Sequence, residues 1–326
     1  MAACCSGCAP KRLRSCFSSG EGGQCAQSGR VFPEWYSGIL LNTKQKIALA
    51  RVVWRVIRVG YRLSNTSVKG QYRRGQLNWS LDLDDGIDFA IFLLGHFEPR
   101  TVRFYQKRIR PGDTVLDIGA NIGAHTLPLA QCVNPGGRVH AFEPTEFAYE
   151  KLLANIGLNP EIQNLIVPNH CFLSATEEEE VPAEIYSSWP LKPTPGVHPK
   201  HRGQLKPTSG AFAVTLDNYC QQHQIERVDW MKIDVDGNEF TVLQGARKLL
   251  SASQPKIVME LSPYASYEAG HSFADFVNYV LGFGYKIYEL ENDRPLPSSP
   301  VELEALVPDG ASINVYLAAP AVNEAR

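Results

Sequence analysis

Apolar positions follow two alternating patterns through the larger, C-terminal part of the chain. Short runs of mostly apolar residues, typical of buried strands, are separated by stretches in which apolar residues recur at helical spacing. The runs predict strands at 114–118, 139–142, 165–167, 230–233, 257–261, 285–290 and 313–318. The stretches between them predict helices from about 124 onward and at 148–157, 216–222, 240–250 and 273–281. This alternation predicts an α/β fold with a doubly wound, mostly parallel, seven-stranded sheet.

The apolar pattern before this region predicts a helix followed by a hairpin. Residues 68–72 and 76–83 predict two strands joined by Arg-Arg-Gly, and alternation in the second strand predicts one buried face. A further helix is expected at 101–109. Within 43–63 an apolar stripe at helical spacing and a row of arginines predict a basic amphipathic helix, with Ile47, Ala50, Val53, Trp54, Ile57 and Tyr61 on one face and Arg51, Arg55, Arg58 and Arg62 on another.

Two segments lack such patterns. Residues 1–40 are rich in Ser, Gly and Cys, which predicts a disordered tail. Its cysteines Cys4, Cys5 and Cys8 could bind a metal ion or carry acyl chains, but no second cysteine pair at zinc spacing accompanies them. Residues 174–210 are polar and proline-rich, which is typical of a functional or a disordered loop. The predicted organisation is a tail at 1–40, a helix-and-hairpin extension at 41–110 and a main domain at 111–326 with a loop insertion at 174–210.

The composition excludes several classes of protein. Of the 326 residues, 44% are hydrophobic and 20% are charged, and the net charge is -2, which is typical of a globular protein rather than a disordered or wholly basic one. No stretch approaches the roughly 18 apolar residues that cross a bilayer. No apolar segment follows the first basic residues, so no secretory signal is expected. We therefore expect a cytoplasmic protein.

The charge is spread unevenly along the chain. Residues 1–70 contain eleven Lys and Arg but two Asp and Glu, so this part carries +9 and the remainder carries -11. A basic amphipathic helix can lie on an anionic membrane, or it can dock on its own domain with its basic face in water. Peripheral contact with an anionic membrane through residues 43–63 is therefore one of two expectations for this helix.

The strand at 114–118 leads directly into a glycine-bearing turn. Glycines at such a turn let a ligand approach the backbone, and doubly wound sheets bind ligands at this edge. The next strand ends at Glu143, whose carboxylate can accept hydrogen bonds from ribose hydroxyls. The GxxxG spacing differs from the GxGxxG motif that holds a pyrophosphate. The sequence therefore predicts S-adenosyl-L-methionine as the cofactor, bound at Asp117, Gly119, Ala120, Asn121, Gly123 and Glu143.

A second polar cluster, Lys232-Ile-Asp234-Val-Asp236-Gly-Asn-Glu239, follows the strand at 230–233. Its three carboxylates could bind a hard cation, or supply a general base and orient a hydroxyl. Alternatively, Asp236 could cap the next helix while Glu239 interacts with the positive end of that helix. Because no histidine joins the cluster, we expect a substrate or catalytic role for Asp234 and no metal site.

Four further side chains are candidates for the site. His125 begins the helix after the glycine turn and His170 follows the third strand, so either could be a base, although a lone histidine is more often structural. Glu260 ends a strand at the same edge of the sheet, where it could reach substrate or accept a hydrogen bond within a loop. Glu98 lies upstream of the sheet and could bind near the cofactor or form a surface ion pair.

Several of these segments resemble the FkbM-type methyltransferases of the class I S-adenosylmethionine-dependent fold. The similarity covers roughly residues 75–290, and Asp236 stands where the family usually has Glu. The matching stretches are Gly95-His-Phe-Glu98, Pro111 to Gly123, Ala141-Phe-Glu-Pro144, Thr215-Leu-Asp217, Met231 to Glu239, Leu243-Gln-Gly-Ala246 and Glu260. The resemblance implies a Rossmann-like methyltransferase sheet and cofactor contacts that include Glu98 and Pro144.

The resemblance also implies methyl transfer to a hydroxyl of a sugar, a glycoconjugate or a natural-product-like small molecule. The expected catalytic residues are Asp234, Asp236, Glu260 and His125, and the expected substrate contacts are Lys232 and Glu239. Two alternatives stay open: a catalytically silent protein that acts as a membrane-associated partner, and a metal-dependent methyltransferase for another acceptor. We expect no nucleic-acid substrate, because an Asn/Asp-Pro-Pro-Tyr-like motif and a basic stripe in the catalytic part are missing. No oligomeric state is predicted.

Overall fold

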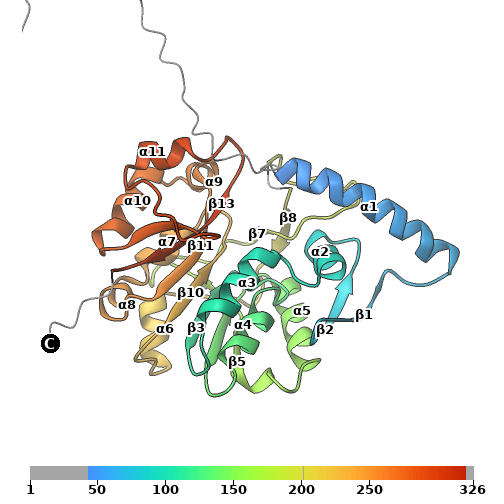
Figure 1. The fold of residues 1–326 in the computed structure, drawn as a ribbon, viewed down its shortest axis with the longest axis horizontal. Helices are drawn as coiled ribbons and strands as arrows, with labels where there is room; N and C mark the ends of the chain where they lie inside the picture. Colours follow the sequence, from blue (N-terminus) through green and yellow to red (C-terminus); the bar gives the residue numbers. More distant parts are fainter. Residues whose placement is uncertain (1–42, 201, 321–326) are drawn as a thin grey trace, which may run out of the picture. The chain divides into compact units, whose positions relative to one another are not determined.

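A central seven-stranded sheet organises the fold (Figure 1). The computed structural model describes residues 43–200 and 202–320. The strand order is β12-β13-β11-β10-β3-β4-β5, in which β13 runs antiparallel to its neighbours and the other pairs are parallel. The strands are β3 Thr114–Ile118, β4 Arg138–Phe142, β5 Ile166–Asn169, β10 Trp230–Ile233, β11 Lys256–Leu261, β12 Lys286–Glu289 and β13 Ile313–Ala318. The predicted doubly wound α/β fold is confirmed.

Helices cover both faces of this sheet, which explains why its strands are almost continuously apolar. Along β3, Val115 belongs to one hydrophobic core and Leu116 to the other. The first core is completed by α1 Thr43–Leu63, α2 Gly86–Leu94, α3 Pro99–Arg108, α4 Thr126–Val133 and α5 Glu146–Gly157. The second is completed by α6 Leu216–Gln222, α7 Glu239–Gln244, α8 Arg247–Ala252, α10 Phe273–Gly282 and α11 Pro300–Ala305. Among the described residues, no helix has both the length and the apolar character needed to span a bilayer.

The register between β3 and β10 determines which side chains meet at the sheet edge. Lys232 on β10 lies opposite Asp117 on β3. The next pair, Ile233 and Ile118, consists of the last residues of the two strands. Gly119 and Asp234 are the first residues beyond these strands, so the two chains emerge side by side. A Cβ atom on Gly119 would lie 1.9 Å from the carbonyl oxygen of Asp234, which shows how closely the two turns pack.

The predicted N-terminal helix and hairpin are confirmed. The hairpin consists of β1 Lys69–Arg74 and β2 Leu77–Asp82, and alternate residues of β2 are buried as expected. Trp79 on β2 and Trp54 on α1 belong to the same core as the sheet. The described residues accordingly belong to one compact unit. The tail predicted at 1–40, with its cysteines, lies outside the described residues.

The expectation of a structureless stretch at 174–210 is wrong. An antiparallel hairpin, β7 Glu184–Ser187 with β8 Gln204–Pro207, lies within it. Two short parallel strands, β6 Cys171–Leu173 and β9 Phe212–Val214, lie just before and just after this stretch. The sequence also did not predict α2, α11 or α9 Pro263–Glu268.

The helix predicted at 240–250 is interrupted between α7 and α8. Gly245 lies in the break, where a Cβ atom would come within 2.1 Å of the carbonyl oxygen of Ser174. The backbone of the break therefore packs directly against a neighbouring loop, which a periodicity argument does not detect.

Candidate active site

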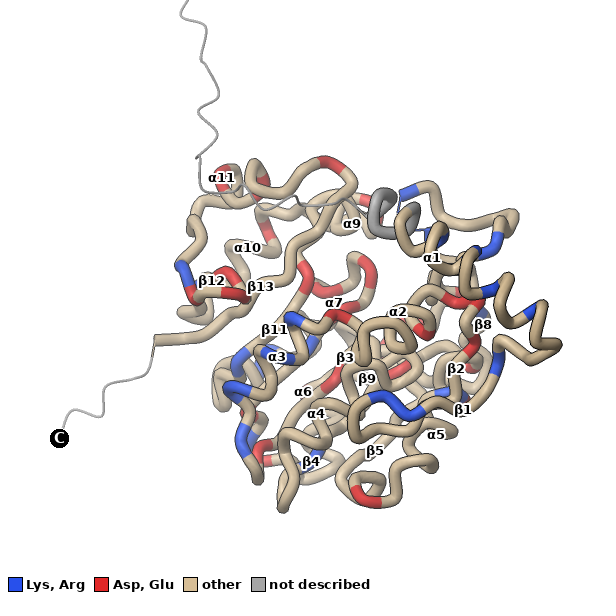
Figure 2. The backbone as a smooth tube through the Cα atoms, turned by 45° about the vertical axis from the view of Figure 1, so that its right-hand side comes forward, with Lys and Arg blue, Asp and Glu red and all other residues tan. Residues whose placement is uncertain are grey.

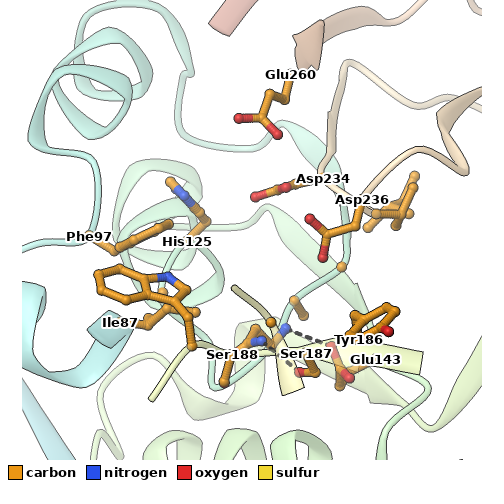
Figure 3. A pocket seen from close by; sticks show the side chains of 18 of the residues that line it. Ile87, Phe97, His125, Glu143, Tyr186, Ser187, Ser188, Asp234, Asp236 and Glu260 are labelled. Atoms are coloured by element: carbon orange, nitrogen blue, oxygen red, sulfur yellow. Dashed lines mark hydrogen bonds between the residues drawn. The ribbon is translucent and has the colours of Figure 1, made fainter. Parts of the chain in front are cut away.

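A cavity of about 560 Å³ lies at the carboxyl edge of the sheet (Figure 3). Its lining includes Gly119, Glu143, Asp234 and Glu260, which come from the ends of β3, β4, β10 and β11. Further walls come from α2, from the segment before α3 and from the β7–β8 hairpin. The volume falls in the range of small-molecule sites, and the position is where doubly wound sheets bind ligands.

Glu143 fixes one end of the cavity. One of its carboxylate oxygens accepts a hydrogen bond from the Asn121 backbone N–H at 2.9 Å, and the other accepts the Thr145 backbone N–H at 2.9 Å and the Thr145 hydroxyl. Burial raises the pKa of Glu143, and the hydrogen bonds from Thr145 and Asn121 oppose that rise. The carboxylate thus joins the turn after β3 to the turn after β4, and the oxygen that accepts from Asn121 keeps a lone pair for a ligand hydroxyl.

The glycine turn rests on a buried polar pair. Asp117 is fully buried and accepts a hydrogen bond from the Thr126 hydroxyl at 2.6 Å, which ties β3 to the start of α4. Its other oxygen lies 3.8 Å from the ammonium group of Lys232, and that ammonium donates to the Gly119 carbonyl at 3.3 Å. Asp117 therefore stabilises the turn through Thr126 and Lys232 and is not part of the cavity wall.

Four carboxylates, from Glu98, Asp234, Asp236 and Glu260, gather in another part of the cavity around one ammonium group. Figure 3 shows Asp234 and Glu260 away from Glu143, with Asp236 next to Asp234 on the side toward Glu143. The Lys232 ammonium nitrogen lies 3.2 Å from a carboxylate oxygen of Asp234. Burial disfavours its charge, but Asp234 and Asp117 outweigh that effect and raise the pKa of Lys232. This part of the cavity therefore carries an excess of potential negative charge.

The surroundings change how readily these carboxylates ionise. Burial, followed by the charge of Asp234, raises the pKa of Glu98 and raises that of Glu260 well above its ordinary value. The same two causes act in the same direction on the pKa of Asp236, although this residue is more exposed than Glu98 and Glu260. Glu98 accepts hydrogen bonds from Asn314 at 2.9 Å and from the Thr101 hydroxyl at 3.1 Å. The surroundings therefore favour the protonated forms of these carboxyl groups.

His125 is a buried side chain of the wall with unused hydrogen-bonding capacity. It is 3% exposed, and among the described residues neither of its ring nitrogens has a hydrogen-bond partner. Phe97 and Tyr105 contact it edge-on, and the nearest carboxylate oxygen, on Glu98, is 3.7 Å from Nε2. Burial and the charge of Lys232 lower its pKa well below the ordinary value. His125 thus presents a neutral imidazole able to accept a proton or a hydrogen bond.

Backbone strain is concentrated in the same walls. Among the described residues, nine other than glycine have positive φ. Four of these nine, Glu98, Asn121, Ser188 and Asp236, line the cavity. Such conformations cost about 1–3 kcal/mol each and persist where the surrounding structure enforces them, typically in functional sites.

The β7–β8 hairpin covers the cavity through Trp189. The Gly86 N–H donates to the Trp189 carbonyl at 3.0 Å, and the Leu191 N–H donates to the Asp84 carbonyl at 2.9 Å, so the loop after β7 is tied to the start of α2. At the end of β7, the Ser187 hydroxyl accepts a hydrogen bond from the Asn121 amide at 3.2 Å. The indole lies against Gly86, where a Cβ atom would come within 2.1 Å of the ring.

This contact predicts that Gly86→Ala loosens the hairpin. Alanine suits the first turn of a helix, so the added methyl acts mainly by pushing the Trp189 indole out of its place. We expect faster amide hydrogen exchange across residues 184–207 and a changed tryptophan emission. Gly157→Ala is the matched control, because nothing lies within 4 Å of the Cβ position there. Unchanged exchange in Gly86→Ala would show that the indole does not hold the hairpin.

Most of the residues predicted from the sequence are brought together here. The cavity is lined by Glu98, Gly119, Ala120, Asn121, His125, Glu143, Pro144, Lys232, Asp234, Asp236 and Glu260. Asp117, Gly123 and Glu239 are not in its lining. Glu239, proposed as a substrate contact, instead accepts the backbone N–H groups of Val235 and Gly237 at 3.3 Å each. His170 also lies outside the lining, stacked on Tyr149.

Other lining residues were missed. Tyr186, Ser187 and Trp189 come from the insertion, and Ser312 comes from the segment before β13. A tryptophan within an otherwise polar, proline-rich loop is the signal in the sequence that could have identified the insertion as a cavity wall.

Comparison with known families identifies the family of this chain. The family described as Methyltransferase FkbM domain matches residues 117–287, which is more than half of the chain and includes the ends of β3, β4, β10 and β11. The chain belongs to the FkbM methyltransferase family. The predicted family resemblance is thereby confirmed.

Two individual relatives share shorter or more distant similarity. The 31-O-demethyl-FK506 methyltransferase FkbM of Streptomyces tacrolimicus is 51% identical over 47 residues, which are 14% of this chain and 18% of that protein. The hexuronic acid methyltransferase AglP of Haloferax volcanii is 22% identical over 156 residues, which are 48% of this chain and 59% of AglP. Each match thus spans less than two thirds of the relative.

Among solved structures, an FkbM methyltransferase from Methylobacillus flagellatus is 17% identical with a TM-score of 0.39, covering 66% of this chain and 50% of that one.

Proposed function

We propose that this protein transfers a methyl group from S-adenosyl-L-methionine to a hydroxyl of a sugar, a glycoconjugate or a natural-product-like small molecule. The observation that carries the proposal is one cavity whose lining includes Glu143, the glycine turn, Asp234 and the neutral His125. Membership of a methyltransferase family supports the reaction class. The names of two relatives, which act on a demethylated FK506 and on hexuronic acid, support an oxygen acceptor.

The residues of the cavity fit this cofactor. Glu143 has lone pairs for ribose hydroxyls, and the turn at Gly119 and Ala120 brings backbone to the cavity surface. Apolar side chains from Phe142, Phe172 and Val242 line the cavity as well and offer surface for a base. A positively charged cofactor suits this wall better than a dinucleotide with a negative pyrophosphate, because a cation stabilises the ionised forms of carboxyl groups that burial otherwise disfavours.

The chain's own residues then have to orient the acceptor hydroxyl and receive its proton. S-adenosyl-L-methionine supplies, when bound, an electrophilic methyl group on a positively charged sulfur. Asp234 can accept a hydrogen bond from the acceptor hydroxyl and orient its oxygen, which is an effect of positioning. The hydroxyl proton has to leave as the new bond to carbon forms, and Asp234 or the neutral His125 can receive it. Trp189 and the hairpin shield this chemistry from water.

The cofactor assignment predicts the effect of Glu143→Ala. Loss of the carboxylate leaves polar partners unpaired, so the affinity for S-adenosyl-L-methionine should fall by about 1–3 kcal/mol, or about 5- to 150-fold. Isothermal titration with S-adenosyl-L-methionine, S-adenosyl-L-homocysteine and NAD measures this, and NAD should fail to bind. Glu146→Ala, which changes an exposed carboxylate three residues later, is the control. Equal affinity in both variants would refute the ribose role of Glu143.

The acceptor is to be identified by incubating the protein with labelled S-adenosyl-L-methionine and panels of sugars, glycans and hydroxylated natural products. The measurement is the label transferred to each compound. The proposed function predicts a product methylated on oxygen, formed by the wild type and not by Asp234→Asn. Cofactor binding with no transfer to any hydroxyl, or transfer to nitrogen alone, would contradict it.

A further inference from the structure

α1 has two apolar faces, and one of them is in solvent. The face predicted from the sequence packs against the domain: Trp54 is buried, and Ala50, Val53, Ile57 and Tyr61 are partly buried against the same core. A second set of apolar residues, spaced three or four apart, points away from it, consisting of Leu49, Val52, Val56, Val59 and Leu63. We call these five residues the outer stripe.

The outer stripe is unusual in extent. Its side chains are between 53% and 84% exposed. It accounts for five of the thirteen large, exposed apolar residues in the described part of the chain. Single exposed apolar residues are ordinary, but a continuous exposed set along one helix indicates an interaction surface.

The charge of α1 indicates which partner this surface fits. The helix contains six Lys and Arg and no Asp or Glu, and blue positions recur along it in Figure 2. Arg51 and Arg58 are engaged with the domain, since Arg51 donates to the Pro190 carbonyl at 3.4 Å and Arg58 lies 3.7 Å from Asp84. Arg55 and Arg62 are exposed, and among the described residues neither has a hydrogen-bond or ion-pair partner. Helical spacing places both of them along one border of the outer stripe.

We infer that α1 binds the surface of an anionic lipid bilayer, with the outer stripe among the upper acyl chains and Arg55 and Arg62 at the headgroups. An apolar stripe bordered by arginines on a helix without acidic residues is the arrangement that lies flat in such an interface. Ala50, on the packed face of α1, lines the candidate active site. The same helix is therefore a wall of the cavity, and binding holds the cavity close to the membrane.

A second copy of the chain fits the outer stripe less well. The three–four spacing resembles a coiled-coil seam, but it extends for only two heptads, whereas stable seams need more. Two copies of α1 would also bring twelve Lys and Arg side chains together with no acidic residue on either helix to balance them. Anionic lipid offers both the apolar phase and the opposite charge.

The test uses the full-length protein and phosphatidylcholine vesicles with and without phosphatidylserine, separated by sedimentation. We expect binding to the phosphatidylserine vesicles that weakens with salt, because charge attraction at a surface is screened. Arg55→Glu and Arg62→Glu should each reduce the partition coefficient about fivefold or more. Val56→Glu should reduce it about tenfold or more, because a charge then enters the apolar phase.

The matched control is Val301→Glu, which places the same charge on a comparably exposed valine of α11. It should bind vesicles like the wild type, and thermal melts of both valine variants should agree, which excludes unfolding as the cause. Equal binding of Val56→Glu and the wild type would overturn the proposal. So would equal binding to phosphatidylcholine alone, or a lipid-free dimer by light scattering that Val56→Glu converts to monomer.

Discussion

Asp234→Asn is expected to slow methyl transfer about 10²–10⁴-fold while the affinity for S-adenosyl-L-methionine changes by no more than a few-fold. The loss is that of a positioned proton acceptor, since asparagine keeps the shape of the side chain but not its basicity. Asp234 lies in the acidic part of the cavity, apart from Glu143. Single-turnover rates and isothermal titration on the same preparations separate chemistry from cofactor binding.

Two comparisons sharpen this experiment. Asp275→Asn, on the exposed first turn of α10, makes the same chemical change away from the cavity and should leave the rate unaltered. His125→Asn tests the other proton acceptor in the wall. If Asp234→Asn retains full rate on the true acceptor while His125→Asn does not, the base is His125 and Asp234 has no part in the chemistry.

A chelator distinguishes a side-chain base from a metal-dependent reaction. The carboxylates near Asp234 are engaged by protein donors, Glu98 by Asn314 and Glu260 by the Ser312 hydroxyl. The Lys232 ammonium, 3.2 Å from Asp234, would also repel a cation there. We therefore expect unchanged turnover after chelator treatment. Loss of activity that magnesium restores would contradict a metal-free mechanism.

The sheet was predictable from the sequence because its strands are buried on both faces. Continuous apolar runs such as 114–118 and 230–233 are hard to confuse with loops, and the helices between them force parallel pairing. Elements that contact the core through few residues gave no such signal. The hairpin at 184–207 is one of these, because its order depends on contacts with α2 that are distant in sequence.

The site was predictable only where its residues follow strands. Asp234 and Glu143 lie at carboxyl ends, so the fold itself brings them together. Asp117 is only two residues from Gly119 of the glycine turn, but it lies within its strand, where it contacts Thr126 and Lys232. Distance along the chain from a motif therefore does not tell whether a side chain reaches the cavity.

The helix α1 illustrates a different limit. Periodicity identified the apolar face that packs, which includes Trp54, but the outer stripe has a periodicity just as regular. Which of two apolar faces meets the domain depends on the surface it packs against, here the core shared with β2. The sequence of a single helix does not contain that information.

Gly119→Ala is the substitution outside the catalytic groups for which we expect the largest effect. Gly119 has a φ of +78°, and its Cβ position lies 1.9 Å from the Asp234 carbonyl oxygen. In alanine the left-handed backbone conformation would cost about 1–2 kcal/mol. Overpacking against backbone that cannot rotate away would cost about 1–3 kcal/mol more. We therefore expect a loss of about 2–5 kcal/mol in the free energy of unfolding, measured by denaturant titration.

Gly112→Ala separates these two costs. Gly112 has a φ of +91° but nothing lies within 4 Å of its Cβ position, so it should lose only the conformational part. The packing of Gly119 on Asp234 has a further consequence, because a shift at the cofactor turn must also displace the turn that carries the proposed base. Gly119→Ala should thus impair both S-adenosyl-L-methionine binding and the single-turnover rate, whereas Gly112→Ala should impair neither. Equal stability and activity of the two variants would show that the close contact between the turns is not needed, and that the two parts of the cavity act independently.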